Sequence, residues 1–221
     1  MTSKWCGHEG DTVLLVEGEN DCHVVLALCA RFGLAHNFGI FQCGNDSRAI
    51  QRMNALIASS VRPTIIGLVV DADNPSLDAK WQSISAKINP HGYTLPDRPA
   101  TGGTILDSSS GGPRLGFWLM PDNQTSGMLE DFCIRMMPIG ARLFIEETLQ
   151  QAKNAGLATF KDVHLSKAIV HSYLAWQDEP GRPLGQAITA NTLAEHSPTS
   201  EQFAEWLSSL FQGAQEIDAP I

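Results

Sequence analysis

The sequence lacks the features that mark a membrane protein, a secreted protein or a zinc protein. Its longest apolar run, residues 24–30, is far shorter than the roughly 18 residues of a membrane span, and the N-terminus has no basic-then-apolar signal layout. The five cysteines are scattered without a C-x-x-C pair, which favours free buried thiols over a disulfide framework or a zinc site. These absences predict a cytoplasmic protein with no membrane partner.

Basic residues and glycine-rich phosphate motifs are also scarce. The 221 residues include 15 Lys and Arg against 24 Asp and Glu, a net charge of −9, which argues against nucleic-acid binding by overall basicity. The patterns G-x-G-x-x-G, G-x-x-x-x-G-K-[ST] and G-x-S-x-G are absent as well. The sequence therefore gives no support to a dinucleotide-binding protein, a P-loop protein or an α/β-hydrolase.

The first two thirds of the chain alternate short apolar runs with amphipathic helical stretches. Strands are predicted at residues 13–16, 38–42, 64–70 and 114–120, with helices between the first three and loops or a hairpin at 91–116. Asn74 and Pro75 are typical of an N-cap and a first helical position. This alternation predicts an α/β fold with a doubly wound, mainly parallel, Rossmann-like sheet over residues 1–137.

Helical spacing dominates the remainder of the chain. Apolar residues recur at helical positions over residues 141–155, 161–176 and 200–211. We therefore predict that residues 138–221 form a C-terminal helical extension. It holds 10 acids and 5 bases, a poor composition for contacting DNA or RNA.

Several acids follow predicted strands, where the ligand crevice of an open parallel sheet lies. Glu17 follows the first strand, Asp71 and Asp73 the third, and Asp122 the last. Each is individually explained by helix capping, but a cluster of carboxylates repels itself unless a cation offsets the charge. Oxygen ligands of this kind select Mg²⁺ or Mn²⁺.

The acids proposed as metal ligands are Glu17, Asp21, Asp71, Asp73, Glu130 and Asp131. Residues 1–137 contain 14 acids and 10 bases, and without these six ligands the domain has 8 acids against 10 bases. Outside the predicted metal site it is mildly basic.

The stretches of sequence that carry these acids resemble the motifs of the Toprim domain. The sequence V-E-G-E-N-D at residues 16–21 follows an apolar strand, and Asp71-Ala72-Asp73 ends another, which is the glutamate and the later D-x-D that mark this family. Residues 126–131, S-G-M-L-E-D, resemble the late G-x-x-E element of the nuclease branch that includes the overcoming-lysogenisation-defect nucleases. The chain also resembles a bacterial group of Toprim-like proteins with a helical C-terminal region.

This resemblance implies divalent-metal-dependent phosphodiester hydrolysis, with DNA a better substrate than RNA. Glu17, Asp71 and Asp73 would be the catalytic residues, and Asp21, Glu130 and Asp131 would help to hold a second ion. Such nucleases work with an ATPase, and this chain has no ATPase motif, so an ATPase partner in trans is implied. Met128 stands where a lysine is expected, and the candidates for the basic group are Lys80, Arg48, Arg114 and Arg135.

Two alternatives remain open. One is a phosphatase or phosphotransferase with a D-x-D nucleophile, although that family places the motif on the first strand. The other is a non-catalytic Toprim-like regulatory or interaction subunit that binds a metal or a partner protein.

Overall fold

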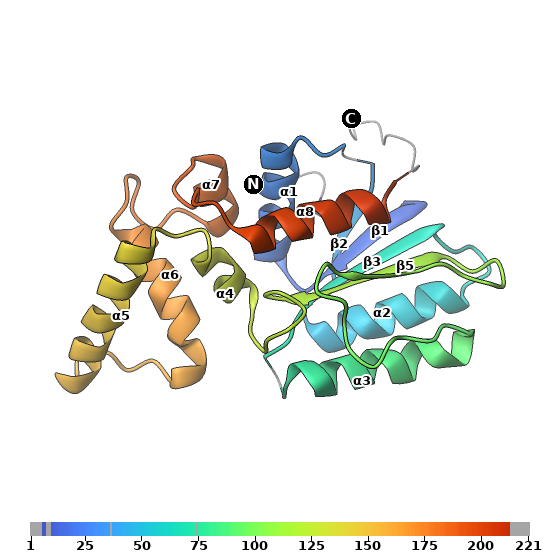
Figure 1. Ribbon diagram of the computed structural model, residues 1–221, viewed down its shortest axis with the longest axis horizontal. Helices are drawn as coiled ribbons and strands as arrows, with labels where there is room; N and C mark the ends of the chain where they lie inside the picture. Colours follow the sequence, from blue (N-terminus) through green and yellow to red (C-terminus); the bar gives the residue numbers. More distant parts are fainter. Residues whose placement is uncertain (1–5, 8–9, 36, 74, 213–221) are drawn as a thin grey trace.

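The framework of the protein is a five-stranded sheet (Figure 1). The computed structural model describes residues 6–7, 10–35, 37–73 and 75–212. The strands are β1 (Thr12–Val16), β2 (Gly39–Gln42), β3 (Ile65–Asp71), β4 (Thr104–Leu106) and β5 (Arg114–Met120). Their order in the sheet is β2-β1-β3-β5-β4, with β4 antiparallel to β5 and the other neighbours parallel. The prediction of an α/β fold with a mainly parallel sheet is confirmed, and the order agrees with double winding.

Eight α-helices and two 3-10 turns connect and follow the strands in the described part of the chain. The helices are α1 (Glu19–Phe32), α2 (Asp46–Ala58), α3 (Leu77–Ile88), α4 (Leu129–Ile134), α5 (Ile139–Asn154), α6 (Leu165–Ala175), α7 (Leu184–Thr189) and α8 (Pro198–Leu210). The 3-10 turns are η1 (Asn89–His91) and η2 (Asp162–His164). In the described chain, no helix is long and apolar enough to cross a membrane.

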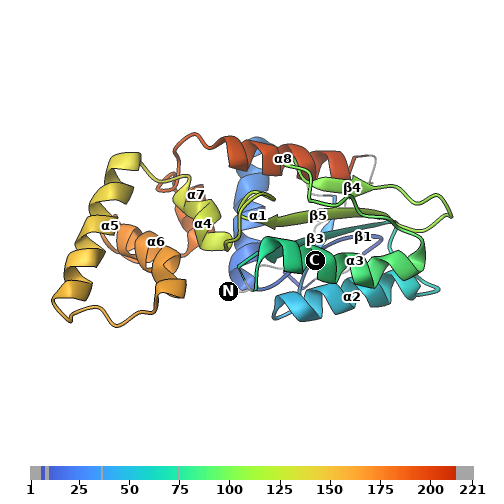
Figure 2. The ribbon, with the colours of Figure 1, turned by 60° about the horizontal axis from the view of Figure 1, so that its bottom comes forward.

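Helices cover both faces of the sheet, as Figures 1 and 2 show, with α2 and α3 on one face and α1 and α8 on the other. The strands are apolar on both sides because each face is buried. Alternate residues of β1 accordingly enter different cores: Val13 and Leu15 pack with α2 and α3, while Leu14 and Val16 pack with α1 and α8.

The close approach of α8 to the sheet depends on two glycines. Gly67 of β3 and Gly116 of β5 are paired in the register, and Leu210 of α8 lies against both. A Cβ atom built on Gly116 would stand 2.4 Å from a methyl carbon of Leu210. The missing side chains therefore leave the space that Leu210 fills.

The predicted extension contains two different parts. Helices α5 and α6 pack on each other and project from the body, as both ribbon views show. Helix α8 instead lies over the sheet, with Trp206, Leu207, Leu210 and Phe211 in its core. The boundary at residue 138 thus marks the end of the sheet-forming segment but not the end of the segment that buries the sheet.

Two local predictions were wrong, and one helix was missed. Helix α3 begins at Leu77, and its N-cap is Ser76, whose Oγ accepts a hydrogen bond from the Ala79 amide; the predicted cap, Asn74, lies outside the described residues. Helix α7 was not predicted. Cys6 and Cys22 form a disulfide rather than staying free, because pairing of Cys6 beside β2 brings its Cα within 6.0 Å of that of Cys22 on α1.

Candidate functional site

The strand order reverses between β1 and β3, because β2 lies on one side of β1 and β3 lies on the other. The predicted acids lie at the carboxyl ends of β1 and β3, next to this switch point. Glu17 follows β1 directly, and Asp71 is the last residue of β3. The Oε1 atom of Glu17 accepts a 2.7 Å hydrogen bond from the Asp71 amide. This bond holds the two carboxyl groups at neighbouring strand ends.

Asp71 also connects the sheet to the N-terminus of α4. Its Oδ1 atom accepts a 2.9 Å hydrogen bond from the Leu129 amide, and the Ala72 amide donates to the Gly127 carbonyl at 2.8 Å. The loop after β5 is therefore fixed beside the end of β3. Glu130, in the first turn of α4, is brought to the same edge by this arrangement.

A pocket of about 330 Å³ opens at this edge. Its walls include Glu17 and Asp71 from the strand ends, Asp21 from α1, Glu130 from α4 and Lys167 from α6. Asp21 and Glu130 are 8% and 6% exposed. Four of the six acids predicted as metal ligands thus share one partly closed space.

The other two predicted ligands, Asp73 and Asp131, line an adjoining hollow of about 570 Å³. Asp73 is exposed, whereas both carboxylate oxygens of Asp131 are already bonded, one to the Met128 amide at 2.8 Å and the other to the Ser166 hydroxyl. Ser166 and Val163 form the opposite wall. The structure therefore separates the six acids into a group of four and a neighbouring pair.

Helix capping explains part of the acid pattern. Asp21 accepts a 3.0 Å hydrogen bond from the Gly18 amide, as Asp131 does from Met128, so each acid caps its helix from the third position. Asp21 combines the capping role with a place in the pocket. Asp131 is bonded through both oxygens, which makes it chiefly a structural residue.

Crowding changes the acidity of the pocket carboxyls. Burial, with the charges of Glu17, Asp21 and Asp73, raises the pKa of Asp71 to about 8. Burial and the charge of Glu17 raise the pKa of Asp21 to about 7, and burial also raises the pKa of Glu17. The pocket thus favours protons, or a cation in their place.

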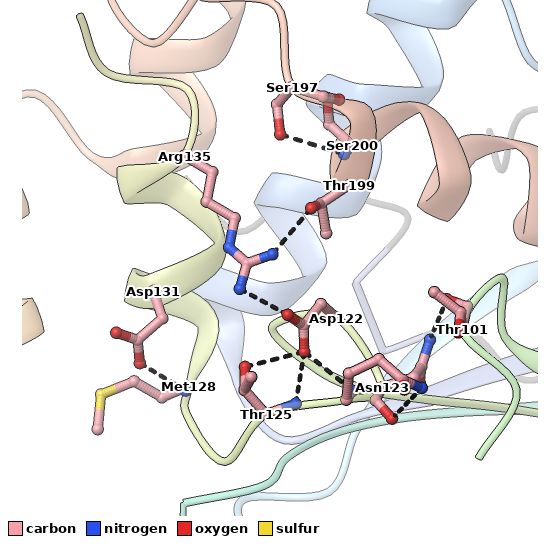
Figure 3. A network of polar contacts seen from close by, with 11 residues as sticks. Thr101, Asp122, Asn123, Thr125, Met128, Asp131, Arg135, Ser197, Thr199 and Ser200 are labelled. Atoms are coloured by element: carbon pink, nitrogen blue, oxygen red, sulfur yellow. Dashed lines mark hydrogen bonds and ion pairs between the residues drawn. The ribbon is translucent and has the colours of Figure 1, made fainter. Parts of the chain in front are cut away.

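Asp122, the acid that follows β5, has a structural role instead. Figure 3 shows Arg135, the C-cap of α4, reaching both the carboxylate of Asp122, at 2.7 Å, and the hydroxyl of Thr199 at the start of α8, at 2.9 Å. Although burial opposes it, hydrogen bonding from Arg135 and from the following turn lowers the pKa of Asp122. This network fixes the loop that leads to Met128 and to the start of α4, which carries Glu130.

The basic residues expected near the site lie mostly elsewhere. Lys80 is buried in an ion pair with Asp46, Arg135 bonds Asp122, and Arg114 pairs with Asp107 at the far end of β5. Arg48 lies beside Gly44, at the rim of the pocket. None of these four lines the pocket itself.

Lys167 is the basic residue in the wall of the pocket, and sequence reasoning missed it. Its Nζ atom is 4.0 Å from an oxygen of Glu130, and its side chain is half exposed. It belongs to α6, which the packing of α6 on α4 brings to the sheet edge. No spacing in the sequence indicates that contact.

The pocket has the donors for a hard cation but not a finished coordination sphere. Among the residues that the structure describes, no three acids, histidines or cysteines are arranged to surround one ion. Glu17, Asp21 and Asp71 each use one carboxylate oxygen to accept a backbone amide. Their other oxygens are the hard donors that Mg²⁺ and Mn²⁺ prefer, so the chemistry of the donor set fits such an ion.

Fold and site together define an α/β protein with an acid-lined pocket at the switch point of its sheet. A family model described as a protein of unknown function, DUF3226, matches residues 11–212, and the chain belongs to this family. Comparisons with curated proteins and with solved structures gave no match. The resemblance to Toprim and to its nuclease branch remains a prediction.

Proposed function

We propose that the pocket binds Mg²⁺ or Mn²⁺ and that the protein hydrolyses phosphodiester bonds of nucleic acid, DNA in preference to RNA. One observation carries the proposal: Glu17, Asp21, Asp71 and Glu130, from three separate stretches of the chain, line one pocket. Four carboxylates in one partly buried space are unfavourable without a positive partner. The half-exposed Lys167 offsets only part of that charge.

Within this proposal the acids have unequal roles. Asp71, Asp21 and Glu130 are the ligands, and Glu17 is a ligand or the proton acceptor, as its raised pKa favours. Asp73, at the neighbouring hollow, is placed to contact the substrate or a second ion. Asp131 supports the site by holding α4 and α6 together.

The reaction also needs positive charge beside the phosphate. A divalent ion in such a site polarises the phosphoryl oxygen and lowers the pKa of bound water. Lys167, half exposed in the pocket wall, adds a mobile ammonium group that reaches a phosphate oxygen. Lys87, which is exposed in the groove between α2 and α3, provides a contact for an adjoining phosphate.

Metal binding and cleavage are tested together. Purified protein is incubated with plasmid DNA or single-stranded DNA in the presence of Mg²⁺ or Mn²⁺, and a parallel sample contains EDTA. The Asp71→Asn variant is tested in the same way, with Asp97→Asn, which alters an exposed loop acid, as the matched control. We expect cleavage by the wild type and by Asp97→Asn only, with loss of at least tenfold in Asp71→Asn. Equal cleavage by wild type and Asp71→Asn would contradict the site.

A non-catalytic role is the second candidate, because the ligand sphere is not finished in the described chain and the α5–α6 hairpin exposes apolar side chains. In this role the protein binds a metal or a partner, such as an ATPase acting in trans, without cleaving nucleic acid. Mn²⁺ would then raise the melting temperature of the wild type but not of Asp71→Asn, with no cleavage by either.

A further inference from the structure

Exposed apolar side chains gather on one part of the protein. Of the eight large apolar side chains that are exposed in the described chain, seven lie between residues 139 and 176. This segment is the projecting hairpin of α5 and α6 (Figures 1 and 2). The eighth, Val61, lies in the loop before β3. Clustered apolar side chains of this kind are unusual on a surface that contacts only solvent, and they mark interaction sites.

Four of the seven lie near the base of the hairpin. They are Ile139, Leu143 and Phe144 of α5 and Trp176, which follows α6, and we call them the hairpin patch; their exposed fractions are 68%, 58%, 62% and 54%. The rings of Phe144 and Trp176 meet edge to face, with centroids 6.0 Å apart. The patch therefore spans both helices.

Helix α5 has little of its surface inside the protein. Among its 16 residues only Ile145 is buried. Ile139 and Leu143 are one turn apart, and helical geometry places them on the side opposite Ile145. Helix α5 thus has one apolar face against α6 and a second that lacks a partner within the described chain.

We propose that the hairpin patch is the contact between two copies of this chain. Charge favours a second copy: residues 138–176 contain four basic and three acidic side chains, whereas the rest of the chain carries a net charge of −10. Two hairpins meet at the patch with almost no net repulsion. The contact packs the open face of α5 in one copy on the same face in the other, as helices pack in a bundle.

The size of the patch agrees with this partner. At these exposures the four side chains leave roughly 400 Å² of apolar surface on each copy. A standard interface covers about 800 Å² on each partner, of which a little over half is apolar. The patch therefore supplies the apolar share of an ordinary dimer contact.

Sedimentation velocity of the full chain over a range of concentrations tests the proposal. We expect the wild type to sediment with twice its 24.0 kDa mass. Leu143→Glu should sediment as a monomer, because it places a charge in each half of the symmetric contact. Val61→Glu changes a still more exposed apolar residue outside the hairpin and should remain dimeric.

Far-UV circular dichroism of each variant checks that it is folded, and Leu143→Gln replaces Leu143→Glu if the latter is not. A wild-type monomer at every concentration would overturn the proposal, even if another protein binds the hairpin. A Leu143 variant as dimeric as the wild type would overturn it too. Neither result depends on metal binding or cleavage, so the dimer and the proposed activity are tested separately.

Discussion

Asp71 illustrates how a single residue serves both fold and site. One of its oxygens holds the Leu129 amide, which places α4, while its carboxyl group lies among Glu17, Asp21 and Asp73. Burial and these neighbouring charges raise its pKa to about 8, so the folded protein favours the protonated form. Without a cation, ionisation of Asp71 opposes folding.

This raised pKa predicts how stability depends on pH. The unfolded chain releases the Asp71 proton near its usual value of 3.8, whereas the folded chain keeps it up to about pH 8. The unfolded state therefore binds fewer protons across this range, and stability falls as the pH rises. In EDTA we expect the melting temperature of the wild type to fall between about pH 5 and pH 8 more steeply than that of Asp71→Asn.

Thermal unfolding at a series of pH values measures this slope. The amide of Asp71→Asn retains an oxygen that accepts the Leu129 amide, so the comparison isolates the charge. Parallel profiles for the two proteins would show that the carboxyl is not perturbed.

At the scale of elements, α4 is a short helix held at both ends. Asp131 joins its N-terminus to Ser166 of α6, and Arg135 joins its C-terminus to Asp122 and Thr199. Asp131 and Asp71 differ in what they do for stability. Asp131 stabilises α4 through its hydrogen bonds, whereas the buried carboxyl group of Asp71 is stabilised only by a proton or a cation. Opposite effects on stability should follow.

We expect Asp131→Ala to lower the free energy of unfolding by about 1–2 kcal/mol at pH 8 in EDTA, because it removes a helix cap and a side-chain hydrogen bond. Asp71→Asn should raise it under the same conditions. Urea denaturation measures both, with Asp97→Ala, which removes an exposed loop acid outside the pocket, as the control that stays near the wild type. A fall of similar size in Asp71→Asn and Asp131→Ala would contradict the division of roles.

The elements were predictable where a local pattern defines them. Six consecutive apolar or small residues after Arg114, bounded by Pro113 and Pro121, gave β5 its observed limits of Arg114–Met120. The start of α3 could not be predicted in this way, because Asn74 and Ser76 are both good N-cap residues and the choice between them depends on tertiary packing. Helix α7 packs mainly on α1, and this contact stabilises a helix that follows directly on Pro180, Gly181 and Pro183, residues typical of a turn.

At the scale of the whole molecule, the sequence predicted the acids of the pocket but not the basic residue in its wall, Lys167. Parallel strands place their carboxyl ends at one edge, so Glu17 and Asp71 could be brought together from topology alone. Lys167 comes from α6, whose position depends on packing between helices remote in sequence. The return of α8 to its own domain agrees with its apolar stripe, but the stripe alone does not show that α8 lies over β3 and β5.

The close packing of α8 on the sheet leads to a prediction about Gly116. Gly116→Ala places a methyl group against Leu210, which is fully buried, and we expect a loss of about 1–3 kcal/mol from overpacking. The loss should be smaller when Gly116→Ala is made in a Leu210→Ala background, because the shortened side chain leaves room. Gly102→Ala, where nothing lies within 4 Å, is the matched control.

Urea denaturation of the four proteins in this cycle measures the coupling between positions 116 and 210. Additive losses would show that α8 does not approach the sheet as closely as the structure has it.

The position of α8 also has a consequence during synthesis. Strands β1, β3 and β5 are complete by residue 120, yet Trp206 and Leu210 cover them only after some ninety more residues have been translated. At about 5–20 residues per second, one side of the nascent sheet is exposed for several seconds. We therefore expect chaperones that bind apolar strands to meet this surface until α8 has left the ribosome and can cover it.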